Sequence, residues 1–249
     1  MQKQIIFGKK LLKILKRPVN IVCVKTGTKY SIHHVKTLYK MVKKNLTLPF
    51  IFYCLTDNVD DLPEEVVGIK LDASLDLESY WWKICLFDLG WNESVLYFDL
   101  DLIIQKNFDY IFKNIDNKKL KCLNTEQIGI FYPYDGSPDN ILTIPPVLIN
   151  TSIMLFNPLE NKYIFNKFMN DVNYNIVKYY GLDRFINHNS ENLTYFDFSK
   201  DYYFRAKGDE FYDPKFVDEN KLIKDPNKTF CIMNQCKPEH YIGMEEYLL

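Results

Sequence analysis

Two aspartates separated by one residue, Asp99 and Asp101, directly follow an apolar run at residues 94–98. In an extended chain alternate side chains share a face, so both carboxylates point the same way and Leu100 points back into the protein. Adjacent carboxylates repel each other unless a cation lies between them, and their hard oxygen atoms suit Mg²⁺ or Mn²⁺. Such an ion could hold a diphosphate and neutralise a leaving group. The alternative is a solvated strand end that binds nothing.

The elements before this pair alternate between strands and helices. The sequence predicts buried strands over residues 20–25, 49–55, 66–71 and 94–98, and helices over residues 31–44 and 78–89. Ser31 is the expected N-cap of the first helix, and Gly90 is expected to stop the second. This order is typical of an α/β fold whose sheet is covered on both faces. Ligands of such sheets bind beyond the carboxyl ends of the strands, where the two aspartates stand.

The second half of the chain is less regular. We expect a loop over residues 120–145, a turn at residues 150–152 leading into a strand that ends at Phe156, a helix over residues 160–178, and short strands and loops over residues 192–249. No repeat, low-complexity segment or linker divides the chain. The sequence therefore predicts a single domain over residues 18–249, preceded by a basic segment at residues 1–17.

The basic N-terminal segment has two interpretations. Residues 3–17 contain six basic side chains and no acid, and their apolar residues recur at helical spacing. The segment could lie on an anionic membrane surface as a helix, or pack on the domain as a short helix with solvated lysines. Pro18 ends it in either case.

Composition excludes several classes of protein. The chain has 249 residues, of which 47% are hydrophobic and 25% charged, which excludes a disordered chain. No apolar run reaches the roughly 18 residues of a membrane span. A net charge of −1 argues against a basic nucleic-acid binder. The aromatic and lysine-rich, arginine-poor composition is typical of an A/T-rich genome, as in a virus, a phage or some microbes.

The cysteines and the N-terminus bear on the compartment. The six cysteines are scattered in apolar runs without the spacing of a zinc site, which indicates free thiols in a reducing compartment. No signal peptide is recognisable. We therefore expect a cytoplasmic protein, in a host cytoplasm or at a membrane periphery if the source is a virus or the basic segment binds lipid.

The order of these elements around the aspartate pair resembles that of GT-A glycosyltransferases, which use nucleotide-sugar donors and an Asp-x-Asp metal motif. The resemblance covers most of residues 19–241 and is closest to the GT8-like and capsular-polysaccharide-type branches. The blocks that carry it are, in chain order, NIVCVKTGTKY, HVKTLYKMVKKNLTLPFIFYCLTD, YWWKICLF, VLYFDLDLIIQKNFDYIF, NTSIMLFNP, GLDRFINH and CIMNQCKPEH. It implies a Rossmann-like α/β fold with one mixed sheet flanked by helices.

The resemblance also implies an activity and a set of site residues. The protein would be a metal-dependent, hexosyltransferase-type glycosyltransferase that moves a sugar from a UDP- or GDP-type donor to a hydroxyl of a glycan, glycolipid or glycoprotein. Asp99 and Asp101 would bind Mn²⁺ or Mg²⁺ and the donor diphosphate. The residues expected to line the donor are Val24, Thr26, Lys29, Tyr30, Lys83, Asn150 and Ser152. Asp183 would lie by the reacting sugar and the acceptor hydroxyl, and Lys237 would stabilise the departing diphosphate.

The chain departs from the family pattern at two places. The third metal ligand is often a histidine in a C-terminal segment, where this chain has Met233 or Asn234. Asn234 is therefore the expected third ligand, or His240 if the loop bends. An Asp-Gln-Asp pattern of some branches is reduced here to Asp183 followed by Arg184, which binds a phosphate or pairs with Asp183.

Other roles and functions remain open at this stage. Lys83 could be a surface lysine, Asn150 and Ser152 could be turn residues, and Asp183 could only cap or begin a helix. A nucleotidyltransferase could share the fold and the paired acids, although residues 26–29 are too short for its Gly-rich loop. A non-catalytic module that binds a glycan or a partner on a GT-A fold is the other alternative.

Overall fold

The computed structural model describes residues 17–125, 147–196 and 229–234, and the backbone of three short strands at Tyr202–Ala206, Val217–Asp218 and Lys221–Leu222. For Ser79 and residues 232–234 only the backbone is described. The basic segment at residues 1–16, residues 126–146, and the predicted site residues Lys237 and His240 lie outside this description.

The main sheet is mixed and has seven strands in the order β3-β2-β1-β4-β7-β6-β8. Their bounds are β1 Val19–Lys25, β2 Phe50–Thr56, β3 Val66–Lys70, β4 Val95–Phe98, β6 Leu120–Asn124, β7 Ile149–Phe156 and β8 Leu193–Tyr195. Strands β3, β2, β1 and β4 are parallel, whereas β7 is antiparallel to both β4 and β6. This confirms the predicted mixed sheet.

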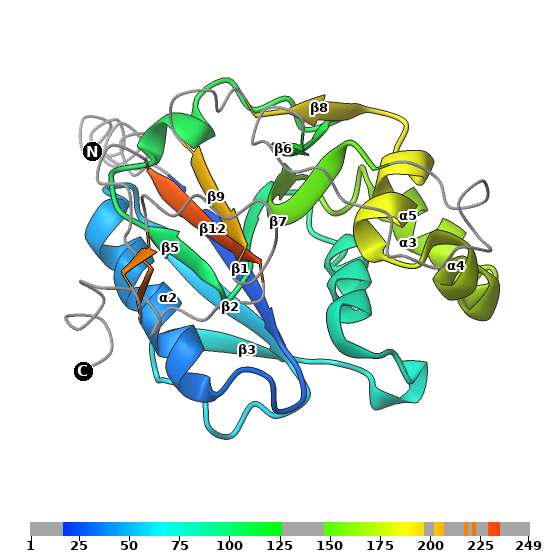
Figure 1. The fold of residues 1–249 in the computed structure, drawn as a ribbon, viewed down its shortest axis with the longest axis horizontal. Coiled ribbons are helices and arrows are strands. Elements are labelled where there is room, and N and C mark those ends of the chain that lie inside the picture. The colour runs from blue at the N-terminus through cyan, green and yellow to red at the C-terminus, as the bar shows by residue number, and fades with distance from the viewer. Residues whose placement is uncertain are drawn as a thin grey trace, which may run out of the picture.

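A smaller sheet lies beside the main one (Figure 1). It consists of β5 (Leu102–Ile104), β12 (Phe230–Asn234) and β9 (Tyr202–Ala206), with β12 in the middle. Strand β5 begins directly after Asp101, so the small sheet continues the chain from the aspartate pair. Strands β10 (Val217–Asp218) and β11 (Lys221–Leu222) form a separate antiparallel pair.

Helices cover the two faces of the main sheet (Figure 1). The elements are α2 (Ile32–Asn45) on one side, and the 3₁₀ helix η2 (Ser79–Asp88) with α3 (Lys162–Met169), α4 (Val172–Tyr179) and α5 (Leu182–Asn189) on the other. Alternate residues of β1 serve the two cores: Ile21 and Cys23 pack with α2, and Val22 packs in the core of η2 and α5. The predicted coverage of both faces is therefore confirmed, and it explains the continuous apolar runs.

The first half follows the prediction closely. The four predicted strands and the first helix are present within one or two residues of their expected bounds. Ser31 is the N-cap of α2, and its backbone N–H donates to His34 Nδ1 at 3.1 Å. The helix predicted over residues 78–89 is present, but it is a 3₁₀ helix.

In the second half of the chain, three secondary-structure predictions are wrong. The single helix predicted over residues 160–178 is wrong, because Asp171 accepts a hydrogen bond from the Tyr174 N–H at 3.0 Å and caps a new helix. The turn predicted at residues 150–152 is wrong, because these residues lie within β7. The loop predicted from residue 120 is wrong over β6, where the backbone pairs with β7.

The described residues also bear on the state of the cysteines and on membrane-spanning helices. The five described cysteines, Cys23, Cys54, Cys85, Cys122 and Cys231, are free and buried, as predicted. None of the helices within the described ranges combines the length and the apolar character that crossing a bilayer requires.

Candidate active site

The candidate site lies where β1 and β4 end. Asp99 directly follows β4, and residues 26–30 form the loop after β1. Because β1 and β4 are parallel, their carboxyl ends meet at one edge of the sheet. The Tyr30 hydroxyl donates to Asp101 Oδ2 at 2.9 Å and joins the two segments. The structure thus brings together a predicted metal ligand and a predicted donor-binding residue.

The loop after β1 is also held from the neighbouring strand β2. Gly27 has a φ of 58°, a left-handed conformation that favours glycine. Its N–H donates to Asp57 Oδ2 at 2.7 Å, in the loop after β2. Burial alone would raise the pKa of Asp57, but this hydrogen bond and the Lys25 charge lower it below its usual value. Asp57 was not among the predicted site residues, although it follows a parallel strand as Asp99 does.

Lys83 is the charged partner of Asp99 among the described residues. Its Nζ lies 2.7 Å from Asp99 Oδ1 and 2.9 Å from Oδ2, and only 14% of its side chain is exposed. Lys83 is therefore not a surface lysine. Burial lowers its pKa, but the carboxylates of Asp99, Asp183 and Asp101 raise it more, so the pKa lies above its usual value. The ammonium group stays charged and compensates part of the acidic cluster.

Tyr97 is a second partner of Asp99, and the sequence prediction missed it. Its hydroxyl donates to Asp99 Oδ1, and its ring is almost fully buried. Burial and the Asp99 carboxylate raise the pKa of Tyr97 well above its usual value, so the phenol keeps its proton. Residues two apart in a strand share a face. The spacing of Tyr97, Asp99 and Asp101 was therefore the signal that could have identified it.

Asp101 is half-buried beside a like charge. Burial and the Asp99 carboxylate raise the pKa of Asp101 to about 7. The Tyr30 hydrogen bond and the nearby lysines act in the opposite direction without cancelling this effect. A divalent cation would relieve the repulsion between the two carboxylates. Two hard oxygen ligands of this kind fit Mn²⁺ or Mg²⁺.

Within the described ranges, no group of three or more His, Cys, Asp or Glu side chains could hold a metal ion. These residues thus offer the ion two carboxylates, and further ligands would come from a bound diphosphate or from residues outside the description. Asn234 is the last residue of β12, opposite Ala206, and only its backbone is described.

Asp183 belongs to α5, which lies on the same face of the sheet as η2 and Lys83. It lies in the first turn of α5, where Gly181 occupies the N-cap position. The Thr151 hydroxyl, in β7, donates to Asp183 Oδ1. Asp183 also interacts electrostatically with Lys83, which connects it to the Asp99 cluster. Thr151 stands between the predicted residues Asn150 and Ser152 and was missed.

The alternation of side chains along β7 is interrupted between Ile149 and Ile153. Ile149 and Ile153 pack in different cores, although residues four apart in a regular strand share a face. The Asn150 side chain accepts from the Ser152 N–H at 3.0 Å, and the Ser152 carbonyl accepts from the Asp99 N–H at 2.9 Å. The irregularity thus places Ser152 against the aspartate pair and leaves Asn150 and Ser152 buried.

The remaining predicted donor residues lie at the same edge. Val24 and Thr26 are half-buried at the end of β1 and in its loop, and Lys29 is exposed. Lys29 Nζ lies 5.1 Å from the centre of the Tyr30 ring. Its charge acts on Asp101 as well. This edge therefore combines a half-buried apolar side chain with positive charge, which suits a nucleotide.

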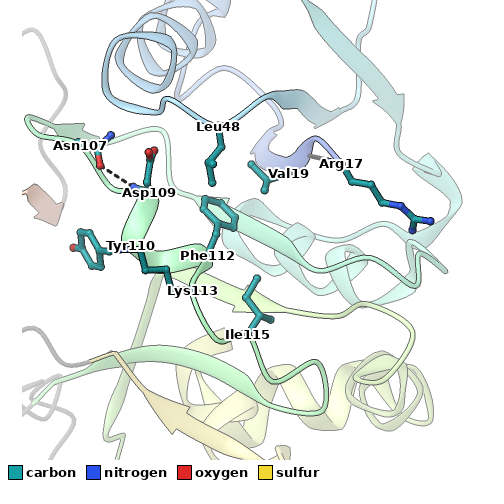
Figure 2. A pocket seen from close by; sticks show the side chains of 9 residues that line it. All are labelled: Arg17, Val19, Leu48, Asn107, Asp109, Tyr110, Phe112, Lys113 and Ile115. Atoms are coloured by element: carbon teal, nitrogen blue, oxygen red, sulfur yellow. Dashed lines mark hydrogen bonds between the residues drawn. The ribbon is translucent and has the colours of Figure 1, made fainter. Parts of the chain in front are cut away.

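A separate pocket lies at the opposite edge, at the amino ends of β1 and β2 (Figure 2). Its volume is about 530 Å³. Val19, Leu48 and Phe112 are among its apolar lining residues, and Arg17 and Lys113 contribute positive charge. It contains none of the predicted site residues.

Comparison with known proteins identifies the fold. Neither a protein-family model nor a curated protein sequence matches the chain. Among solved structures, an active-site mutant of LgtC is similar at a TM-score of 0.60 and 14% identity, over 92% of this chain and 94% of that one. The galactosyltransferase LgtC in complex with donor and acceptor sugar analogues gives 0.58 and 13% over the same shares.

Two larger proteins are similar over part of their length. The bifunctional glycosyltransferase WbbM gives a TM-score of 0.63 at 12% identity, over 94% of this chain and 49% of that one. The glycosyltransferase GlyE of Streptococcus pneumoniae TIGR4 gives 0.52 at 14%, over 73% and 46%. These proteins are GT-A glycosyltransferases, and the chain has the GT-A fold, as the sequence predicted.

Proposed function

We propose that the protein is a metal-dependent glycosyltransferase that moves a sugar from a UDP- or GDP-type donor to a hydroxyl acceptor. The observation that carries the proposal is the half-buried cluster of Asp99, Asp101 and Lys83 at the carboxyl ends of β1 and β4. The similarity to a galactosyltransferase that binds donor and acceptor sugar analogues supports it. The acceptor is a hydroxyl of a glycan, glycolipid or glycoprotein.

The donor side of the mechanism rests on the residues around the aspartate pair. When bound at Asp99 and Asp101, Mn²⁺ or Mg²⁺ supplies positive charge that stabilises the departing diphosphate. Lys83 holds both oxygens of Asp99, and Tyr30 orients Asp101. The nucleotide lies along Val24, Thr26 and Lys29. In this proposal Lys237 contributes further charge at the diphosphate, and Asn234 or His240 completes the metal ligands.

The acceptor side rests on Asp183. The Thr151 hydrogen bond fixes one oxygen of its carboxylate. A carboxylate oxygen has more than one acceptor site, so Asp183 can also accept a hydrogen bond from the acceptor hydroxyl and orient it towards the sugar. Lys83 interacts electrostatically with both Asp99 and Asp183, so its positive charge reduces the repulsion between the two acidic groups.

The proposal is tested by thermal unfolding with UDP-, GDP-, CDP- and dTDP-sugars, each with and without Mn²⁺. A ligand at about 100 times its Kd stabilises the native state by about 2.7 kcal/mol, which raises Tm by several degrees in a chain of this size. We expect a Mn²⁺-dependent shift with one nucleotide class, and hydrolysis or transfer of that sugar.

The matched variants are Asp101→Asn and Asp72→Asn. Asp101 lies in the cluster, whereas Asp72 is an exposed cap of a short 3₁₀ helix. The Mn²⁺-dependent part of the shift is expected to disappear only in Asp101→Asn. If none of the nucleotide sugars shifts Tm, the proposal is refuted. The same holds if the Mn²⁺-dependent shift is unchanged in Asp101→Asn. Binding without any hydrolysis or transfer would point to a non-catalytic module.

A further inference from the structure

Two exposed tyrosines and an arginine lie on the elements next to Asp183. Tyr80 in η2 is 47% exposed, and Tyr180 at the end of α4 is 61% exposed. Arg184 Nη1 donates to the Tyr180 carbonyl at 3.3 Å, which holds the guanidinium beside the backbone of Tyr180. Helices η2 and α5 pack against each other. The charges of Asp183 and Arg184 and the Tyr180 hydroxyl act on Tyr80 across this pair of packed helices.

The Arg184 guanidinium retains capacity for a ligand. A guanidinium has five N–H donors, and Arg184 uses one of them on the Tyr180 carbonyl. Among the described residues, no ion pair within 4.0 Å joins it to a carboxylate. Its side chain is half-buried, which strengthens an ionic contact relative to open solvent.

The backbone of Tyr180 has an unusual conformation for a tyrosine. Tyr180 has a φ of 47°, in the left-handed region that a bulky residue rarely adopts. The Tyr180 N–H still donates to the Ile176 carbonyl at 3.0 Å, so the conformation is a helix end. Glycine or asparagine is the usual residue at such an end. The chain instead places an exposed aromatic ring there.

We propose that Tyr80, Tyr180 and Arg184 form an acceptor subsite for a sugar that carries an anionic group, either a carboxylate or a phosphate. The tyrosine rings offer amphipathic surfaces for the apolar faces of a sugar. The planar guanidinium matches the two oxygens of a carboxylate or phosphate. The inference rests on the proposed function, because Asp183 would then lie at the acceptor hydroxyl.

Saturation-transfer NMR on the full chain tests the subsite with three probes: methyl β-D-glucoside, methyl β-D-glucuronide and glucose 6-phosphate. We expect at least one anionic probe to bind about tenfold more tightly than the neutral glucoside. The stronger of the two anionic probes identifies carboxylate or phosphate as the recognised group. Arg184→Gln should remove the preference, and Tyr180→Asn, which suits the left-handed backbone, should weaken all three probes.

Arg17→Gln is the matched control, because Arg17 lies before β1 at the opposite edge of the sheet. It should leave the preference unchanged. Equal binding of neutral and anionic probes, binding of none, or a preference that persists in Arg184→Gln would overturn the subsite. A parallel titration of UDP with Mn²⁺ should give the same affinity in Arg184→Gln and in the unmodified chain. If UDP with Mn²⁺ does not bind the unmodified chain, this counts against the proposed function. The subsite is judged separately, from the binding of the three sugar probes.

Discussion

At the scale of single residues, the candidate site is organised around the two oxygens of Asp99. Tyr97 and Lys83 both reach Oδ1, and Lys83 also reaches Oδ2. A carboxylate held from two sides cannot rotate freely, so its oxygens are fixed for a ligand. The two partners can be tested separately, because one is neutral and the other is charged.

Tyr97→Phe keeps the buried ring and removes the hydroxyl. Groups that orient a metal ligand typically contribute 10–100-fold to metal affinity. We therefore expect Mn²⁺ to bind about tenfold more weakly, as measured by calorimetric titration in the presence of UDP. The control is Tyr39→Phe, because Tyr39 lies in α2 and its ring packs on Phe50 and Phe52 of β2. Equal Mn²⁺ affinity in Tyr97→Phe and Tyr39→Phe would show that Tyr97 does not orient Asp99.

Lys83→Met removes the charge that compensates Asp99. Breaking a buried ion pair costs about 3–5 kcal/mol, and partial exposure of this pair places the expected loss near the lower end. Urea unfolding without metal measures it, and added Mn²⁺ should restore part of the stability. The control is Lys162→Met, whose pair with Asp88 at 2.8 Å is much more exposed and should lose at most about 1 kcal/mol. Equal losses in both variants would contradict the assigned role.

At the scale of elements, success of the sequence prediction followed the periodicity of the apolar residues. Strands β1, β2 and β4 are continuous apolar runs because both faces of the sheet are covered. The break between α3 and α4 depends on one hydrogen bond at Asp171, which an apolar pattern at spacing four does not reveal. The sequence predicts a turn at residues 150–152 because Asn150 and Ser152 favour turns, but pairing of β7 with β4 and β6 overrides that preference.

One side-chain contact between elements makes stability depend on pH. Asp109, in the 3₁₀ helix η3 (Asp109–Phe112), accepts from the Thr47 N–H at 2.9 Å and from the Thr47 hydroxyl, just after α2. Burial raises the pKa of Asp109, but these hydrogen bonds lower it more, and it lies below its usual value. A depressed pKa adds stability above the unfolded-state pKa of about 3.9, which is lost as the pH falls through the folded-state value.

Asp109→Asn should therefore reduce the acid sensitivity of this connection. We expect the free energy of unfolding to be lower than in the unmodified chain at pH 6, and the difference to shrink as the pH falls below about 4. Urea unfolding between pH 6 and pH 2.5 measures both trends. A difference that stays constant over this range would rule out the carboxylate as its origin.

At the scale of the whole molecule, the sequence predicted the fold better than the site. The α/β order and the resemblance were sufficient for the GT-A fold, and Asp99, Asp101, Lys83 and Tyr30 do lie together. Asp57 and Thr151 were missed because their contacts join segments distant in sequence. Tyr97 lies only two residues from Asp99, and the alternation of side chains along the strand could have identified it. The expected roles of Lys237, Asn234 and His240 remain predictions.

The pairing of β5 with β12 has a consequence for the order of assembly. Strand β5 follows the aspartate pair directly, but its partner β12 comes more than a hundred residues later. Closing so long a loop is slow relative to local pairing. A nascent chain would therefore hold its repelling carboxylates beside an unpaired strand edge until the C-terminal part has been synthesised. Pulse-labelled hydrogen exchange during refolding should find the β5 amides protected after those of β1 and β2. Simultaneous protection would mean that the edge carrying Asp99 and Asp101 forms together with the rest of the sheet.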